Sequence, residues 1–374
     1  MAKWDIFCRI VDNYGDIGVC WRLAKQLAAE HDKHIRLWID DLQIAQKLIP
    51  TLNPALGAQT IQGVELCRWQ DAENTNNIGD VVIEAFACEL PPAYLQKMAA
   101  RQPVWINLEY LSAEPWVTNF HARASRHPTL PLSKHFFFPG FEPGTGGLLR
   151  EHELIARRDA FRNSPQAQHE FLQKFGIPKH TDLKVSLFSY RHAPLVGLLQ
   201  ALANSPQPVL CLVPDNGILP AVGEYFGNIR LEAGAVAHHG NLTLLALPFL
   251  SQDEYDQLLW LCDINFVRGE DSWVRAIWAG KPMIWLPYRQ QENTHLQKLE
   301  AYLQVYCRGL APYTAAAVQK IHANWCSDAL PEANWREYLE HLPVLGRHAK
   351  DFAAKLATES DLASKLVIFC GNPA

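Results

Sequence analysis

The sequence predicts an α/β protein made of two doubly wound halves. Its 374 residues suffice for about two domains of ordinary size. Short apolar runs alternate with stretches of helical spacing, and the runs are continuously apolar rather than alternating with polar residues. Such strands, separated by helices, are typical of a parallel sheet covered on both faces. The alternation stops near the middle of the chain and then restarts, which indicates a second sheet.

The first half begins with a strand, a turn and a helix. WDIFCRIV at 4–11 is an apolar run, DNYGDIG at 12–18 is rich in turn-forming residues, and 19–31 has helical spacing. Further strands are predicted at 34–39, 80–86 and 104–108. The segment from 109 to about 150 is predicted to be irregular, because Pro, Gly and Phe crowd it.

The second half follows a predicted linker. A charged helical stretch at 151–175 leads to Gly176-Ile177-Pro178. Strands are then expected at 183–188, 208–213, 242–247, 263–267 and 282–286, with helices at 193–203, 253–261, 271–279 and finally 351–367. Ligands of doubly wound sheets bind beyond the carboxyl ends of the strands. We therefore expect a cleft between the halves and seek functional residues in the loops after strands.

Charge, cysteine content and hydropathy narrow the function classes. Lys and Arg number 34 against 39 Asp and Glu, whereas proteins that neutralise nucleic-acid phosphates are usually basic. The nine cysteines are scattered without a C-x-x-C pair, and the histidines, including His238-His239 in an expected loop, lack metal-binding spacing. Neither a membrane span nor a signal peptide is recognisable. We expect a cytoplasmic, metal-independent protein that binds neither nucleic acid nor membranes.

The loop after the first strand holds two acids four residues apart, Asp12 and Asp16. Its glycines allow a tight turn and the close approach of a ligand. Two carboxylates in a cleft suit a general base or a clamp for a cationic acceptor. Either acid could instead simply cap the following helix, and the sequence leaves both interpretations open. The loop matches neither the dinucleotide-binding pattern nor the P-loop pattern.

A second loop, NFVRGEDSW at 265–273, joins a predicted strand to a predicted helix. The start of a helix favours an anion and Arg268 adds a full positive charge, so a diphosphate would fit there. Asp271 or Ser272 as a helix cap would leave Arg268-Gly269-Glu270 unexplained, so we favour a ligand site. Phosphate would repel Glu270, which is therefore predicted to accept a hydrogen bond from a sugar hydroxyl.

Aromatic residues follow several of the predicted strands. Phe188, Tyr190 and Phe249 could hold a nucleobase, since stacking contributes about 1–3 kcal/mol per base. Taken singly, each is more readily explained as a core residue. Tyr288 and Glu292, in LPYRQQEN, follow another strand end and are weaker candidates of the same kind.

Four segments together resemble a known family. They are DNYGDIGVCWRLAKQL from residue 12, INLEYLSAEPW at 106–116, KHFFFPGF with TGGLLRE at 134–151, and NFVRGEDSWVRAIWAGKPMIW at 265–285. They resemble the EarP family of protein-arginine rhamnosyltransferases, which modify bacterial elongation factor P, and the likeness covers essentially the whole chain. It implies a GT-B fold of two facing Rossmann-like domains. Those domains would be 1–175, completed by the C-terminal helix 351–374, and 176–350.

The resemblance also implies a reaction and a set of site residues. Family members transfer L-rhamnose from dTDP-β-L-rhamnose to one arginine of elongation factor P with inversion, which supports translation of proline-rich stretches. The partner is docked mainly by the N-terminal domain. By this likeness Asp16, as general base, Asp12 and Glu270 are expected to be catalytic. The expected donor-binding residues are Asn13, Tyr14, Gly15, Phe188, Tyr190, Phe249, Arg268, Gly269, Asp271, Ser272, Tyr288 and Glu292, with no cofactor or metal.

Two alternatives remain open from the sequence. A GT-B enzyme for a small-molecule or lipid acceptor would share the donor loop but would not need the acidic clamp. A non-catalytic protein that binds a sugar nucleotide or the elongation factor is the other. The presence of Asp12, Asp16 and Glu270 favours an enzyme.

Overall fold

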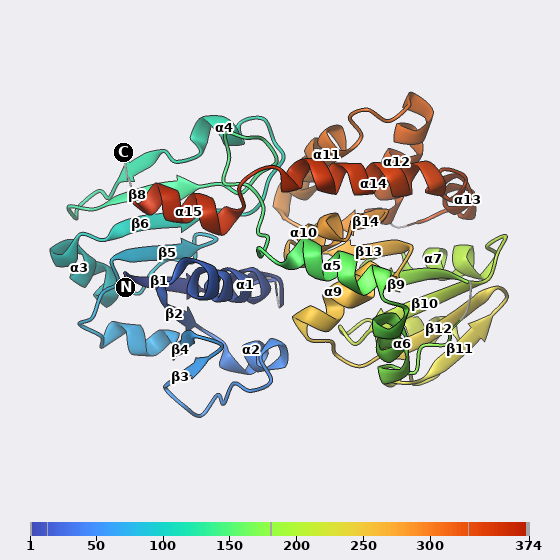
Figure 1. Cartoon of the computed structure of the whole chain (residues 1–374), viewed down its shortest axis with the longest axis horizontal. Coiled ribbons are helices and arrows are strands. Elements are labelled where there is room, and N and C mark those ends of the chain that lie inside the picture. Colours follow the sequence, from blue (N-terminus) through green and yellow to red (C-terminus); the bar gives the residue numbers. More distant parts are fainter. Residues whose placement is uncertain (1, 13, 180–181, 328, 372–374) are drawn as a thin grey trace. The chain divides into compact units, whose positions relative to one another are not determined.

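The computed structural model describes residues 2–12, 14–179, 182–327 and 329–371, and the chain divides into two compact units (Figure 1). Unit 1 comprises Met1–His152 and Ala357–Ala374, and unit 2 comprises Glu153–Leu356. Each unit has its own sheet, as the restart of the strand–helix alternation after the middle of the chain predicts. No described helix is both long enough and apolar enough to cross a membrane.

Unit 1 is built on an eight-stranded sheet in the order β3-β4-β2-β1-β5-β6-β8-β7. The inner six strands are parallel, whereas the edge strands β3 and β7 are antiparallel to their neighbours. The strands are β1 (Lys3–Cys8), β2 (His34–Ile39), β3 (Ala58–Ile61), β4 (Val64–Arg68), β5 (Val81–Ala85), β6 (Val104–Leu108), β7 (Ala124–Arg126) and β8 (Ser133–Phe137). The helices are α1 (Tyr14–His31), α2 (Leu42–Leu48), η1 (Trp69–Glu73), α3 (Pro92–Arg101), α4 (Val117–Phe120) and α15 (Leu362–Gly371).

The central strand β1 is apolar because it is buried on both faces. Its alternate residues Trp4, Ile6 and Cys8 join the core beneath α1 and α15. Phe7 points to the opposite face, where its ring lies 5.8 Å from Trp38 and 4.7 Å from Tyr94 of α3. Strand β1 is thereby fixed between two apolar layers, and the loop at its carboxyl end inherits that fixed position.

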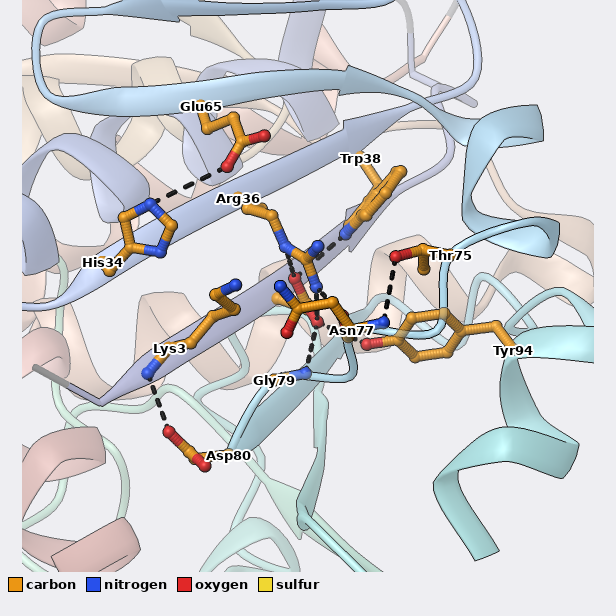
Figure 2. Close-up of polar contacts among 11 residues, drawn as sticks. Lys3, His34, Arg36, Trp38, Glu65, Thr75, Asn77, Gly79, Asp80 and Tyr94 are labelled. Carbon is orange, nitrogen blue, oxygen red and sulfur yellow. Dashed lines mark hydrogen bonds and ion pairs between the residues drawn. The ribbon is translucent and has the colours of Figure 1, made fainter. Parts of the chain in front are cut away.

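A buried carboxylate, Asp5, organises the amino end of this sheet. The Arg36 guanidinium donates to both of its oxygens, at 2.6 and 2.7 Å. Trp38 Nε1 donates at 3.1 Å, Gly79 N–H at 2.8 Å, and the Tyr94 hydroxyl also donates to the carboxylate. Figure 2 shows Arg36, Trp38, Gly79 and Tyr94 directed toward one another from β2, the loop before β5 and α3. Five donors thus stabilise one fully buried charge.

Unit 2 is built on a six-stranded sheet in the order β11-β12-β10-β9-β13-β14, in which only the edge strand β11 is antiparallel among the described strands. Its strands are β9 (Leu183–Leu187), β10 (Val209–Pro214), β11 (Val236–His239), β12 (Leu242–Leu247), β13 (Ile264–Arg268) and β14 (Met283–Leu286). Its helices are α5 (Leu154–Asn163), α6 (Pro165–Lys174), α7 (Leu195–Ala203), α8 (Leu219–Tyr225), α9 (Gln252–Leu261), α10 (Asp271–Ala279), η2 (Gln291–Asn293), α11 (Thr294–Tyr306), α12 (Pro312–Trp325), α13 (Glu332–Glu340) and α14 (Leu342–Ala357).

The boundary between the units differs from the one expected at residue 175. Helices α5 and α6 belong to unit 2, because their side chains pack on its helices. Arg158 donates to the Trp278 carbonyl at 2.8 Å, and the Phe161 ring lies 5.8 Å from Trp260. Lys174 at the end of α6 pairs with Glu254 at 2.7 Å. The division therefore falls between His152 and Glu153, and Gly176-Ile177-Pro178 is a turn within unit 2.

The C-terminal segment that groups with unit 1 begins at Ala357 rather than at residue 351. Leu362 and Leu366 of α15 join the core over β1 and α1. The Leu362 N–H donates to the Leu148 carbonyl at 3.0 Å, and Arg150 donates to the Ala357 carbonyl at 2.6 Å. Helix α14, which precedes this segment, lies in unit 2 up to Leu356.

Two other expectations were wrong in detail. The segment from 109 to 150 is not wholly irregular, since it contains α4, β7 and β8. These elements are short and β7 is exposed throughout, so they carry little apolar periodicity. His238 and His239 lie in the edge strand β11 rather than in a loop. Both histidines are exposed, so neither face of β11 requires an apolar residue at these two positions.

Candidate active site

Asp16 lies in the first turn of α1, directly after the loop that follows β1. Its Oδ2 accepts hydrogen bonds from the backbone N–H groups of Val11 and Asp12, each at 2.8 Å. Its Oδ1 accepts a hydrogen bond from the Tyr110 hydroxyl at 3.0 Å. Asp16 is only 2% exposed, so three donors hold a carboxylate that is almost inaccessible to water.

Burial controls the acidity of Asp16. Desolvation raises its pKa above the ordinary aspartate value, and this effect outweighs the two backbone N–H groups and Tyr110, which favour the ionised form. The like charge of Asp40, which accepts a hydrogen bond from the Ile10 N–H at 3.0 Å, adds to the rise in pKa. A carboxylate with a raised pKa is a stronger base than an exposed one. The geometry therefore suits a general base.

The interaction of Asp16 with the backbone also bears on the capping alternative. A capping side chain binds N–H groups in the first turn of its helix. Asp16 instead binds those of Val11 and Asp12, which precede α1. Its structural role is thus to hold the loop in place, and Oδ1 faces Tyr110 rather than the helix.

Asp12 is half-buried in the same loop, and its placement depends on Gly15. The Gly15 N–H donates to the Asp12 carbonyl at 2.7 Å, and a Cβ at position 15 would lie 2.8 Å from Asp12 Oδ2. A larger side chain there would displace the carboxylate. Tyr14 opens α1 and is half-buried. Asn13, the remaining candidate of this loop, lies outside the described residues.

Tyr110 is a site residue that the sequence analysis did not select. It follows β6, and its ring stacks on Phe86 after β5, with centroids 4.2 Å apart and planes at 12°. Phe86 and Ala87 both have positive φ, 57° and 53°, which is uncommon for such residues and typical of functional loops. The rule that ligands bind beyond strand ends could have found both aromatic residues.

In unit 2, the loop between β13 and α10 brings Arg268 and Ser272 together. The Arg268 N–H donates to Ser272 Oγ at 3.2 Å, and the same hydroxyl donates to the Arg268 carbonyl. Gly269 has a φ of 62°, and Trp285 Nε1 donates to its carbonyl at 2.8 Å. Glu270 occupies the capping position without a side-chain cap. Neither Asp271 nor Ser272 is therefore the N-cap of α10. The interpretation that one of these two residues caps the helix was wrong.

The Arg268 guanidinium lies against two of the predicted aromatic residues. Its central carbon is 4.9 Å from the Phe188 ring centroid and 4.5 Å from the Tyr190 centroid. Tyr190 is in turn 5.9 Å from Tyr288 in an edge-on contact and stacks on His192 at 5.3 Å. Burial, aided by Arg289 and other cations, lowers the pKa of His192. A fixed positive charge, a helix start and flat rings meet here, as a nucleoside diphosphate would require.

The other candidates of unit 2 are more dispersed. Phe249 is half-buried after β12, which is separated from β9 by β10. Tyr288 follows β14 and is exposed, although it touches Tyr190. Glu292 is exposed in η2 with a φ of 55°.

A buried ion pair that the sequence pattern does not single out fixes α10, the helix that follows the Arg268 loop. Arg275 of α10 donates to both oxygens of Asp256 of α9, at 2.9 and 2.6 Å, and both side chains are buried. The pair ties α10 to α9. Trp273 stacks on Trp285 with centroids 3.7 Å apart. The first turn of α10 is therefore held on two sides. Within the described ranges, no group of three or more His, Cys, Asp or Glu residues could hold a metal ion.

Comparisons with known proteins agree with the expected family. A family model described as Elongation-Factor P (EF-P) rhamnosyltransferase EarP matches residues 4–371. A protein-arginine rhamnosyltransferase of Pseudomonas putida is 47% identical over 374 residues, which cover 99% of both chains. A protein of the same name from Neisseria meningitidis serogroup B is 33% identical and covers 97% of this chain and 96% of its own.

Solved structures support the fold. A structure described as the basis for EarP-mediated arginine glycosylation of translation elongation factor EF-P covers both chains fully, with a TM-score of 0.72 and 37% identity. The spinosyn forosaminyltransferase SpnP, at 11% identity and a TM-score of 0.52, covers 99% of this chain and 100% of its own and shares the fold alone. The expected GT-B class is thus confirmed. The chain belongs to the EarP family of rhamnosyltransferases.

Proposed function

We propose that this protein transfers L-rhamnose from dTDP-β-L-rhamnose to an arginine side chain of elongation factor P, with inversion at the sugar. Family membership supports the class of reaction. The observation that carries the proposal is the buried Asp16 carboxylate, held by two backbone N–H groups and Tyr110 beside Asp12. Unit 1 would hold the acceptor arginine, and unit 2 would hold the nucleotide sugar.

The acceptor half must activate a poor nucleophile. An arginine has a pKa of about 13.8 and an ordinary carboxylate about 4, so complete proton transfer beforehand would cost about 13 kcal/mol at about 1.36 kcal/mol per unit. Burial raises the pKa of Asp16, which narrows the difference between the two pKa values and so lowers the cost of proton transfer. We infer that Asp12 and Asp16 grip the planar guanidinium and that Asp16 takes its proton while the new bond forms.

The donor half stabilises the leaving group. In a single displacement, an arginine nitrogen forms a bond to C1 of the sugar as the bond from C1 to the diphosphate oxygen breaks, and the proton moves to Asp16. The leaving diphosphate gains charge, which Arg268 and the first turn of α10 would stabilise. Phe188 and Tyr190, already in contact with Arg268, would hold the base with Phe249. Glu270 would accept a hydrogen bond from a sugar hydroxyl.

The remaining candidates would complete the donor site. Gly269, with its positive φ, would let the backbone approach the diphosphate, and Ser272 keeps the Arg268 backbone in place. Asp271, Tyr288 and Glu292 would line the nucleotide, and Asn13, Tyr14 and Gly15 are likewise proposed as donor-binding residues. The reaction as written needs no cofactor or metal. It would take place in the cytoplasm, where elongation factor P supports translation of proline-rich stretches.

Mass spectrometry of intact elongation factor P tests this proposal. After incubation with the protein and dTDP-rhamnose, the expected product is heavier by one deoxyhexose, attached to an arginine. UDP-glucose in place of dTDP-rhamnose serves as the donor control. Binding of both substrates without a mass gain would identify a non-catalytic binding protein, and transfer only to other acceptors would identify a different GT-B enzyme. Either result would refute the proposed function.

A further inference from the structure

Two exposed aromatic residues of unit 1 touch each other on the segment that follows Tyr110. Trp116 is 42% exposed and Phe120 is 56% exposed. Their ring centroids lie 5.9 Å apart, edge to face. Trp116 directly precedes the single-turn helix α4, which Figure 1 shows, and Phe120 ends it. Contiguous exposed apolar side chains, unlike single ones, are a feature of interaction sites.

The segment beneath these rings is fixed. The Trp116 ring also packs edge to face on the buried Phe138, with centroids 5.3 Å apart, and Val117 is buried. His121, directly after α4, accepts a hydrogen bond from the Phe138 N–H at 3.1 Å. Burial, with the nearby Lys365, lowers the pKa of His121 to about 4, so its ring stays neutral and can accept that bond. Trp116 and Phe120 are therefore presented in a set orientation, which reduces the entropic cost of binding.

The chain connects this patch to the acidic loop. Tyr110, which donates to Asp16, precedes Trp116 by six residues, so the two lie at most about 20 Å apart. The turn between them is closed by Ser112, whose hydroxyl donates to Glu114 at 2.9 Å. A standard protein interface buries about 800 Å² on each partner, a patch about 30 Å across. One protein partner can thus cover both features.

The charge of the segment indicates the kind of partner. Residues 109–120 contain two glutamates and no Lys, Arg or His, and Arg123, which donates to the Asn119 carbonyl at 3.1 Å, adds one cation beside α4. The acids outnumber the base, which favours a partner that presents an arginine. Val11, also exposed, adds an apolar side chain directly before Asp12. Exposed apolar side chains thus occur both next to Asp12 in the chain and in the segment after Tyr110.

We propose that Trp116 and Phe120, the aromatic patch, dock the folded protein that carries the acceptor arginine. This inference rests on the proposed function and specifies where unit 1 grips its substrate. Tryptophan and other aromatic residues dominate interface energetics when they become desolvated at the centre of a contact. The patch would determine affinity for the protein acceptor but would leave the transfer step itself unchanged.

Binding and transfer assays on three variants test the aromatic patch. Elongation factor P is titrated into the full-length protein with Trp116→Ala, Phe120→Ala or Tyr313→Ala, and dTDP-rhamnose affinity is measured in parallel. Tyr313 is the matched control, since it is a 63% exposed aromatic residue of unit 2 in edge-on contact with His341. We expect the first two changes to raise the Kd for elongation factor P about tenfold or more. The dTDP-rhamnose affinity and the transfer rate at saturating acceptor should stay as in the wild type.

The outcomes separate this inference from the proposed function. If the wild type modifies elongation factor P and both patch variants bind it as tightly as the Tyr313→Ala control, the aromatic patch is not the docking surface. If Trp116→Ala destabilises the packing around Phe138, the affinity of Phe120→Ala for elongation factor P alone decides whether the aromatic patch is the docking surface, because Phe120 is more exposed. If the wild type neither binds nor modifies elongation factor P, the proposed function fails and this inference fails with it.

Discussion

Asp5 lies near the amino end of β1 and Asp16 lies beyond its carboxyl end, and the hydrogen-bond donors around the two carboxylates differ. Both side chains are buried, at 0% and 2% exposure. Asp5 accepts five hydrogen bonds, two of them from the Arg36 guanidinium. Within the described part of the chain, Asp16 accepts three, all from neutral donors. Removing one partner of a buried ion pair destabilises the fold, whereas a buried carboxylate that only neutral groups hold has a raised pKa and is a candidate base.

Replacing Asp16 should give the largest effect on activity. Asp16→Asn keeps the size and an acceptor oxygen but cannot take a proton, so the single-turnover transfer rate should fall about 1,000-fold. Because burial raises the pKa of Asp16, its ionisation costs folding stability at pH values above that pKa. The variant should therefore unfold at the same temperature as the wild type or higher. A near-normal rate with both substrates bound would remove Asp16 from the base role.

Replacing Asp5, at the amino end of β1, by asparagine should lower the stability of the fold rather than the transfer rate. Asp5→Asn leaves the buried Arg36 guanidinium without its counter-charge, so the free energy of unfolding should fall by about 3 kcal/mol. Denaturant titration measures this loss. The transfer rate per folded molecule should equal that of the wild type, and a loss of rate as large as in Asp16→Asn would abolish the distinction between the two carboxylates.

Arg268 extends the comparison to unit 2, where the proposed function pairs this positive charge with the diphosphate of the donor. Arg268→Ala should weaken dTDP-rhamnose binding and lower kcat/KM for the donor about 100-fold. The kcat/KM of Arg268→Lys for the donor should lie between those of the wild type and Arg268→Ala, because lysine keeps the charge but not the flat contact with Phe188 and Tyr190. Arg230→Ala is the control, since Arg230 is exposed and forms a surface ion pair with Glu232. Equal donor affinity in the Arg268 and Arg230 variants would refute the donor-site assignment.

Tyr110→Phe should have the smallest effect on the transfer rate. The Tyr110 hydroxyl lowers the pKa of Asp16, so its removal raises that pKa further and leaves less of the carboxylate ionised. The rate near neutral pH should fall less than tenfold, and the loss should shrink as the pH rises. A pH-independent loss would assign Tyr110 to binding rather than to tuning Asp16.

The sequence predicted the larger features of this molecule but not its finer ones. The continuous apolar runs predicted β1, β2, β5, β6 and every strand of unit 2 except β11, because buried parallel strands are strongly patterned. They missed the edge strands β3, β7 and β11, which are short and partly exposed, and also β4 and β8, in which polar residues interrupt the apolar run. The unit boundary was misplaced because helices α5 and α6 carry no local sign of the unit on which they pack.

The candidate site was predicted in a similar way. Asp12, Asp16, Arg268 and Ser272 stand out because short motifs after strands concentrate polar residues. Tyr110 and the pair of Asp256 and Arg275 did not, since each acts through a partner that is distant in sequence. Long-range pairing is set by tertiary packing, which a linear pattern does not contain.

The pH dependence of the single-turnover transfer rate tests the central claim most directly. If Asp16 accepts the arginine proton, it must be ionised, so the rate should rise with pH and level off above an apparent pKa higher than the ordinary 3.8. The residual rate of Asp16→Asn should lack this rise. The same pH-dependent rise in both proteins, or a wild-type rate that is flat through this range, would contradict the role of Asp16 as the base.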